Sequence, residues 1–243
     1  MKVFVVAKKK DEVYKTVSKL FEIVGDIADC DIVITIGGDG TILGAGISAA
    51  IANKPLLGIN TGRLGFMATL EKDELWKLGE LKMGRYSKSR RMLLNVNGTL
   101  ALNDVVFHRK SSRLSEFTVF SGDVEETIVE VFKVRADGVI ISTPTGSTAY
   151  SLSAGGPIIE PELECFLVTA LSPHTLFNRP IIFSHDRRLT VKAKDITVSI
   201  DGQESEFSDY VVVTKSEYHL DLINIIGHNF YDSIHNKLMK PLK

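Results

Sequence analysis

The chain has few cysteines, one tryptophan and no long apolar run. Cys30 and Cys165 are the only two cysteines, and they lie far apart in the 243 residues. This spacing excludes a disulfide framework and a CxxC metal pair. Reduced thiols are typical of the cytoplasm, so we expect a cytoplasmic protein.

Two further absences limit the partners. The opening residues, MKVFVVAKKK, are too briefly apolar for a signal peptide, and no stretch approaches the about 20 apolar residues of a membrane helix. Lysine and arginine number 29 against 30 aspartates and glutamates, so no basic surface is available for bulk binding of nucleic acid. The six histidines show no metal-ligand spacing. We therefore expect no membrane, no nucleic acid and no protein-borne metal site.

The hydrophobic fraction of 44% is that of a globular protein, and residues 1–84 alternate strand and helix patterns. Alternation of this kind predicts parallel strands connected by helices, a Rossmann-like α/β domain. The predicted strands are Val3–Ala7, Ile32–Ile36 and Pro55–Ile59, and the predicted helices are Asp11–Val24, Thr41–Asn53 and Glu71–Leu81, the last including Trp76 as a packing residue.

The pattern changes to short β segments separated by turn pairs over residues 85–227, which predicts a β-sandwich domain. Asn97-Gly98 and Asp201-Gly202 have hairpin-turn chemistry. Residues 228–243 turn helical again, and we expect this helix to return to the first domain. The predicted strands are Met92–Val96, Leu100–His108, Phe117–Phe120, Thr127–Val134, Gly138–Ser142, Arg188–Ala193, Ile196–Ile200 and Tyr210–Thr214.

The run Gly37-Gly38-Asp39-Gly40-Thr41 follows a buried strand and begins a helix. Open α/β sheets bind ligands at this edge, and glycines let the backbone approach an anion closely. A carboxylate beside a phosphate loop suggests a base for phosphoryl transfer, although Asp39 as a plain helix N-cap is the alternative. The run matches neither a P-loop nor G-x-G-x-x-G, so lipid, sugar and nucleotide acceptors all stay open.

Two other segments carry polar groups inside apolar surroundings. Asn103-Asp104 lies within a β stretch and matches a ribose diol, unless it is a strand-end turn. Residues 135–157 run from an apolar strand into a turn rich in hydroxyls and glycine, where Tyr150 offers a flat face for a purine or a carboxamide. A loop of serine and threonine capping a helix is the alternative for this segment.

The three motifs, in this order, resemble those of the NAD kinase family. That family transfers a terminal phosphoryl group to the 2′-hydroxyl of the adenosine ribose of NAD, making NADP. Its fingerprints are GGDGT, an Asn-Glu or Asn-Asp pair, and the block DG…STPTGSTAYSLSAGGPI. They stand here at 37–41, 103–104 and 137–158, and the resemblance covers essentially the whole chain.

The resemblance also implies roles for individual residues. Asp39 would accept the proton of the 2′-hydroxyl. The implied NAD-binding residues include Asp39, Gly40 and Gln203, and Phe66 would pack on the adenine. Around the adenosine the resemblance implies Thr148, Ala149, Tyr150, Ser151 and Ser153. Asn103 and Asp104 would hold the nicotinamide-side ribose and carboxamide, and Arg135 and Asp137 would lie at the nicotinamide end. The implied phosphate-donor loop is Gly37, Gly38, Gly40, Thr41 and Arg63.

The same resemblance implies a divalent metal, Mg²⁺, held through the donor's phosphates, and a homodimer or homotetramer. The expected substrates are NAD and either ATP or polyphosphate, between which the sequence does not choose. Two alternatives remain. A lipid kinase of the diacylglycerol kinase type shares GGDGT but should lack the block at 143–157, and a non-catalytic NAD-binding sensor would keep the fold without turnover.

Overall fold

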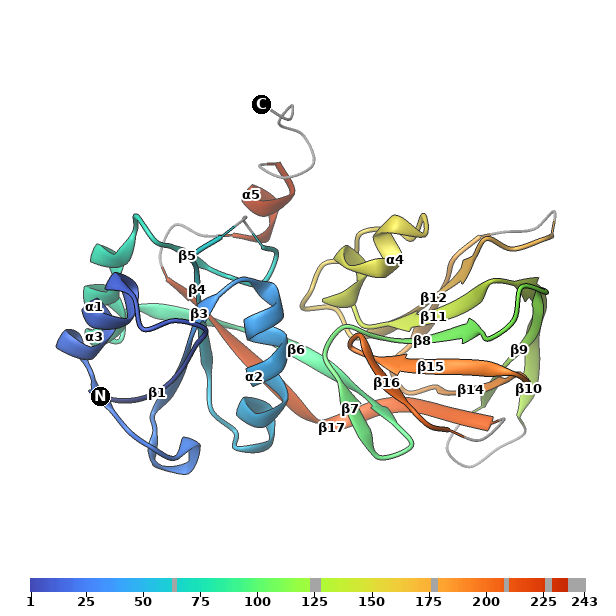
Figure 1. Cartoon of the computed structure of the whole chain (residues 1–243), viewed down its shortest axis with the longest axis horizontal. Coiled ribbons are helices and arrows are strands. Elements are labelled where there is room, and N and C mark those ends of the chain that lie inside the picture. The colour runs from blue at the N-terminus through green and yellow to red at the C-terminus, as the bar shows by residue number, and fades with distance from the viewer. Residues whose placement is uncertain (63–64, 123–127, 176–178, 208–209, 226–228, 236–243) are drawn as a thin grey trace. The chain divides into compact units, whose positions relative to one another are not determined.

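The computed structural model describes residues 1–62, 65–122, 128–175, 179–207, 210–225 and 229–235. The chain divides into two compact units, Met1–Arg91 with Tyr218–Lys243, and Met92–Glu217. The sequence places these boundaries at 84/85 and 227/228, whereas the units divide inside two long strands that continue from one unit into the other (Figure 1). No helix in the described part of the chain is long and apolar enough to cross a membrane.

The first unit is built on a parallel sheet, as the alternating pattern predicts. Its strand order is β2-β1-β3-β4-β17, with β5 beside β4, and every pairing is parallel. The strands of this sheet are β1 (Lys2–Ala7), β2 (Glu22–Ile23), β3 (Ile32–Gly37), β4 (Leu56–Asn60), β5 (Leu70–Glu71) and the second half of β17 (Tyr210–Ile225).

Helices cover both faces of this sheet, which explains why all six residues of β3 are buried. Helices α1 (Glu12–Leu20) and α3 (Leu78–Lys82) contribute to one apolar core, and α2 (Asp39–Ile51) packs on β3 and β4 (Figure 1). Asp11 caps α1 by accepting from the backbone N–H groups of Val13 and Tyr14. The short 3-10 turns of this unit are η1 (Ile27–Asp29) and η2 (Leu75–Lys77).

Two helix predictions in this unit are partly wrong. The first helix ends at Leu20, because Glu22–Ile23 pairs with β1. The predicted helix over Glu71–Leu81 is also replaced by β5, η2 and α3. Trp76 is 73% exposed and does not pack in the core, whereas Leu75, Leu78 and Leu81 of this segment do.

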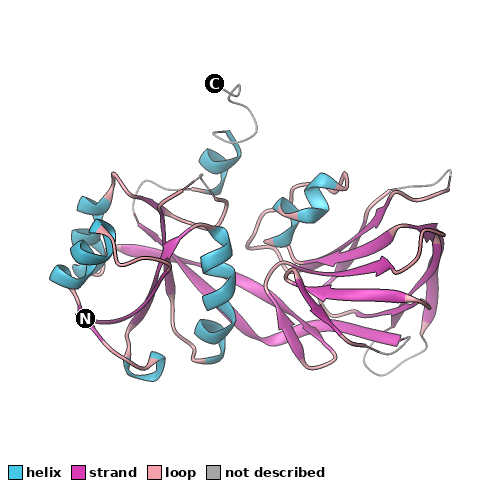
Figure 2. Ribbon diagram, in the orientation of Figure 1, coloured by secondary structure: helices cyan, strands magenta, loops and turns pink. Residues whose placement is uncertain are grey.

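The second unit is a sandwich of two sheets, as predicted (Figure 2). Its core contains side chains from both sheets, with Phe107, Phe117 and Phe166 among the largest fully buried ones. One sheet contains β10 (Val129–Ala136), β9 (Ser115–Gly122), β14 (Arg188–Lys192) and the first half of β17, with β6 (Tyr86–Val96) and β7 (Thr99–Ala101). The other has the order β13 (Ile181–Ser184), β12 (Cys165–Leu171), β11 (Gly138–Ser142), β8 (Asp104–Arg109), β15 (Ile196–Ile200) and β16 (Gln203–Ser205).

Two predicted hairpins are confirmed by backbone geometry. Asn97 and Gly98 have φ of 48° and 94°, and Asp201 and Gly202 have φ of 48° and 79°. Positive φ at both central residues is the conformation that a two-residue hairpin requires. Each pair joins two antiparallel strands, β6 to β7 and β15 to β16.

The helical tail belongs to the first unit, as expected. Its described part is α5 (Phe230–Ile234), which Asn229 caps through the backbone N–H of Asp232. The ring of Phe230 lies 6.5 Å from the ring of Phe66, so the tail contacts the segment after β4. Two expected features lie outside the described residues: Arg63, and the tail beyond His235.

Candidate functional site

Asp39 is the first residue of α2 and follows Gly37, the carboxyl end of β3, with only Gly38 between them. Its carboxylate accepts hydrogen bonds from the backbone N–H groups of Phe66 at 2.6 Å, Met67 at 3.2 Å and Ala68 at 3.4 Å. The donors follow β4, which neighbours β3, so the loops of adjacent parallel strands meet at one edge. The N-cap of α2 is Gly38, which excludes the alternative in which Asp39 is that cap.

Gly65 makes this arrangement possible. A Cβ at position 65 would overlap both carboxylate oxygens of Asp39. By contrast, a Cβ at Gly38 or Gly40 would meet no atom within 4 Å. Packing therefore demands the glycine at 65, while the glycines on either side of Asp39 leave open space at the start of α2.

Thr41 adds a buried polar atom to the first turn of α2. Its Oγ1 is inaccessible and has no hydrogen-bond partner among the described residues. Orphaned buried hydroxyls are uncommon and costly. The backbone N–H groups at the start of this 13-residue helix give the segment 37–41 the donors of an anion site, whereas the buried hydroxyl of Thr41 is not accessible to a ligand.

Asn60 and Glu71, neither of them an expected site residue, stabilise the same edge of the sheet. Asn60 is fully buried at the carboxyl end of β4, and its Nδ2 donates to Glu71 Oε1 and Oε2 at 3.1 and 3.0 Å. Its Oδ1 accepts from the N–H of Gly62. This pair fixes the beginning of the loop that returns to Asp39.

In the second unit, Asn103 lies between β7 and β8 and Asp104 is the first residue of β8. The expectation that both lie inside one β stretch is therefore wrong. Asp104 is only 5% exposed, and burial, followed by the negative charge of Asp201, raises its pKa to about 7. The sequence predicts Asp201 only as a hairpin-turn residue, and Gln203, which the resemblance implies at the NAD site, is exposed at the start of β16.

The block after β11 divides into a buried part and an accessible part. Ser142 to Ser147 are buried, and the hydroxyl of Ser147 donates to Pro144 O at 2.6 Å and accepts from Ile159 N at 3.0 Å. Ser151 is also buried, with its hydroxyl 2.9 Å from that of Thr169. Many of these polar residues thus hold the loop together, so the alternative of a self-bonded loop describes the buried part.

The accessible part begins at Thr148, the last residue of η3 (Gly146–Thr148), and continues through Ala149 to Tyr150 at the start of α4 (Tyr150–Ser153). Tyr150 is 42% exposed and stacks on His108, with ring centroids 5.9 Å apart and an interplanar angle of 28°. Thr148 and Ala149 are partly buried beside it, and Ser153 is exposed. These residues leave surfaces that a ligand can contact.

A cavity of about 490 Å³ brings Tyr150 and Asp137 together. Arg109 donates from Nε to Asp137 Oδ1 at 2.6 Å, and this bond lowers the pKa of Asp137. The partner of Asp137 is thus Arg109, which the sequence analysis does not name. Arg135 is exposed on β10, where its carbonyl accepts from His174 N–H. The cavity is lined by His108, Arg109, Lys110, Ser111, Ser112, Asp137, Tyr150, Leu171 and Ser172.

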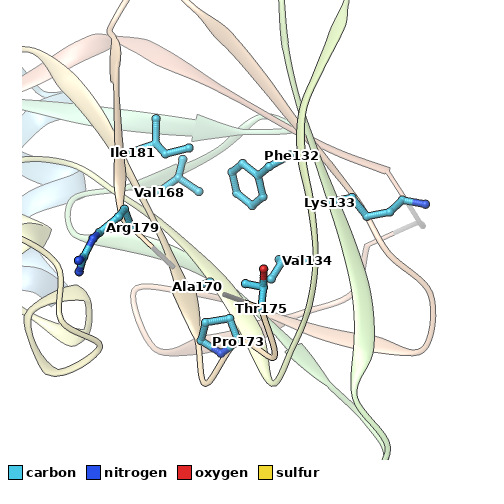
Figure 3. Close-up of a pocket in the computed structure, with 9 residues that line it drawn as sticks. All are labelled: Phe132, Lys133, Val134, Val168, Ala170, Pro173, Thr175, Arg179 and Ile181. Atoms are coloured by element: carbon cyan, nitrogen blue, oxygen red, sulfur yellow. The ribbon is translucent and has the colours of Figure 1, made fainter. Parts of the chain in front are cut away.

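A second cavity of about 180 Å³ contains no predicted site residue (Figure 3). Phe132, Val168 and Ile181 gather at one end of it, and Lys133 points away on the far side of β10. It lies where β10 and β12 approach each other and is mostly apolar. We therefore assign it to packing of the sandwich rather than to chemistry.

The sequence and the fold of this chain were compared with those of known proteins. Residues 3–80 match the ATP-NAD kinase N-terminal domain, and residues 102–225 match the ATP-NAD kinase C-terminal domain. The NAD kinase of Saccharophagus degradans is 42% identical over 230 residues, which cover 86% of this chain and 76% of that protein. The chain belongs to the NAD kinase family.

Other NAD kinases agree in sequence and in fold. The NAD kinase of Teredinibacter turnerae is 41% identical over 228 residues, covering 86% of this chain and 76% of that protein. The crystal structure of an NAD kinase from Archaeoglobus fulgidus in complex with ATP has a TM-score of 0.82 and 26% identity, and covers 98% of this chain and 99% of that one. Yeast NADH kinase complexed with NADH shares the fold, with a TM-score of 0.85 at 22% identity over 100% and 88% of the two chains. As an NAD kinase family member, the protein is a phosphotransferase.

Proposed function

We propose that this NAD kinase phosphorylates the 2′-hydroxyl of the adenosine ribose of NAD, using ATP or polyphosphate as the donor. The carboxylate of Asp39 carries the proposal, because three backbone N–H groups hold it in one orientation beside the open start of α2. A fixed acceptor next to an anion site is what phosphoryl transfer to a hydroxyl requires.

In this mechanism the backbone N–H groups at the start of α2 bind the donor's phosphates. Asp39 takes the proton of the 2′-hydroxyl while the 2′-oxygen of the ribose bonds to the terminal phosphorus of the donor. The bond between that phosphorus and the bridging oxygen of the donor breaks. Asn103, Asp104 and Tyr150 would hold the dinucleotide. An ATP complex of the Archaeoglobus fulgidus relative supports ATP as one donor.

We also propose that a divalent cation, Mg²⁺, is bound mainly by the donor's phosphates, whose charge it would neutralise. Among the described residues, no group of three or more His, Cys, Asp or Glu side chains is arranged to hold a metal. The backbone N–H groups at the start of α2 suit phosphate rather than a bare cation. Here this chain's own contribution is to position the phosphates.

A coupled assay of NADP formation from NAD, with ATP and with polyphosphate in Mg²⁺, tests the proposal. We expect Asp39→Asn to reduce kcat by about 10²-fold while NAD binding stays nearly intact. Asp29→Asn is the matched control, since Asp29 is an exposed carboxylate of the same unit. Wild-type turnover retained in Asp39→Asn would remove Asp39 as the base, and NAD binding without any turnover by the wild type would favour the sensor instead.

A further inference from the structure

Asp201 binds a segment that lies almost one hundred residues earlier in the chain. Its carboxylate accepts from the backbone N–H groups of Leu102 at 2.7 Å, Asn103 at 2.8 Å and Asp104 at 3.1 Å. Its own N–H donates to the carbonyl of Asp104 at 3.0 Å. Four hydrogen bonds thus connect the tip of the β15–β16 hairpin to the start of β8.

A second residue, Thr143, holds the other side of the bound segment. Leu102 and Asn103 lie between β7 and β8 and belong to neither strand. The carbonyl side of the segment is held by Thr143, whose Oγ1 donates to Leu102 O at 2.6 Å and whose N–H donates to Asn103 O at 2.9 Å. Asp201 satisfies the opposite, N–H side, where buried donors would otherwise have no acceptor.

The side chains carried by this segment are those expected to meet NAD. The amide of Asn103 is partly exposed and makes no side-chain hydrogen bond to any residue that the structure describes. The carboxyl of Asp104 is buried beside Asp201, whose charge contributes to the raised pKa of Asp104. Asp201 therefore fixes the backbone under both side chains and influences the protonation of one of them.

We propose that Asp201 is a positioning residue for NAD, holding the Leu102–Asp104 backbone so that Asn103 and Asp104 face the dinucleotide. This inference rests on the proposed function, because Asn103 and Asp104 are taken as NAD contacts. The carboxylate of Asp201 accepts hydrogen bonds from three backbone donors, so this role requires no contact between Asp201 and the substrate. It acts on binding of NAD and not on the phosphate donor.

Asp201→Asn is the direct test, with the full chain, NAD, ATP and Mg²⁺. Asparagine keeps the volume and tolerates the positive φ of 48°, but its single oxygen cannot replace a carboxylate that accepts three N–H groups. We expect the KM for NAD to rise about tenfold, the KM for ATP to change less than threefold, and amide hydrogen exchange at Leu102, Asn103 and Asp104 to accelerate.

Asp195→Asn is the matched control, because Asp195 is an exposed aspartate of the same unit with a φ of 54°. It should change neither the KM for NAD nor the exchange. An unchanged KM for NAD in folded Asp201→Asn, or an equal rise of both KM values, would overturn the inference. Failure of the wild type to phosphorylate NAD would instead overturn the proposed function, and slow exchange at 102–104 would still be measurable.

If Asp201→Asn does not fold, Thr143→Val tests the same segment from its carbonyl side. This change removes the hydroxyl that binds Leu102 O and keeps the side-chain shape. We expect a smaller rise in the KM for NAD, again without a matching change for ATP. Faster exchange at 102–104 with an unchanged KM for NAD would show that the order of this segment does not determine NAD binding, and would overturn the inference.

Discussion

Asp39 and Asp104 hold their carboxyl groups in opposite surroundings. Asp39 is partly exposed and accepts three backbone N–H groups. Asp104 is buried, and its nearest charged neighbour is another carboxylate, Asp201. The first arrangement orients an acceptor, whereas the second makes the ionised form of Asp104 unfavourable.

The raised pKa of Asp104 predicts a pH dependence of stability. Its pKa changes from an ordinary 3.8 to about 7 on folding, so the folded chain binds this proton more tightly than the unfolded chain. The free energy of unfolding should therefore fall as the pH rises from about 4 to about 7. Asp104→Asn removes this dependence. We therefore expect the free energy of unfolding of the variant, relative to that of the wild type, to increase by roughly 2–4 kcal/mol as the pH rises over that range.

Urea unfolding at about pH 4.5, 6 and 8 measures the difference in the free energy of unfolding between Asp104→Asn and the wild type. These values cover the range in which Asp104 loses its proton. Asp195→Asn serves again as the comparison, since its carboxylate is exposed. Parallel curves for Asp104→Asn and the wild type would contradict the prediction.

The sequence predicts some of these residues and not others, for a physical reason. Asp39 is recognisable because its neighbours in sequence are the glycines that surround it. Arg109 and Asp201 act through partners that are 28 and 97 to 99 positions away, so no local pattern marks them. Contacts between residues so far apart in the sequence can be recognised only once the pairing of the strands is known.

At the scale of elements, the segment that returns from β4 to Asp39 requires a glycine at position 65. Gly65→Ala would place a methyl group on the Asp39 carboxylate and displace it. We expect the rate of NADP formation to fall about 10²-fold, the scale of a misplacement of about 1 Å, with little change in far-UV circular dichroism.

Gly62→Ala is the paired control, because a Cβ at Gly62 meets no atom within 4 Å. Comparable losses in both variants would show that flexibility of the segment, and not the carboxylate, is responsible. Full activity of Gly65→Ala would show that the position of Asp39 seen here is not the one used in turnover.

Element types are predicted well where the apolar period is clear and less well elsewhere. β3 and β11 are apolar runs ended by turn residues, and both are predicted within one residue. Cys165–Leu171 is equally apolar and was not predicted, although it is a central strand. The helix predicted over Glu71–Leu81 begins late, at η2, because Leu70–Glu71 pairs with β4 instead.

On the scale of the whole molecule, two strands belong to both units. β17 contributes Val211 and Val213 to the core of the sandwich, and Ile223 and Ile225 to the core of the parallel sheet. β6 likewise runs through the division at Arg91. Loss of either core should therefore loosen a strand on which the other depends.

We expect one calorimetric unfolding transition that both cores control. Val213→Ala and Ile223→Ala should each lower its midpoint, by about 2–4 °C for every kcal/mol of lost packing. Glu217→Ala, an exposed position on the same strand, should leave it nearly unchanged. Two resolved transitions, each moved by only one of the substitutions, would show that the units unfold independently.

The long strand β17 also decides when the first unit can be completed during synthesis. β4 is made early, but its outer neighbour is reached only when Leu222 pairs with Leu56. In a nascent chain that has emerged as far as residue 91, β5 can pair with Ile59 and Asn60 of β4, but the edge of β4 at Leu56 has no partner until the entire sandwich has been translated. The ribosome-bound chain therefore exposes part of a strand edge that the finished enzyme pairs.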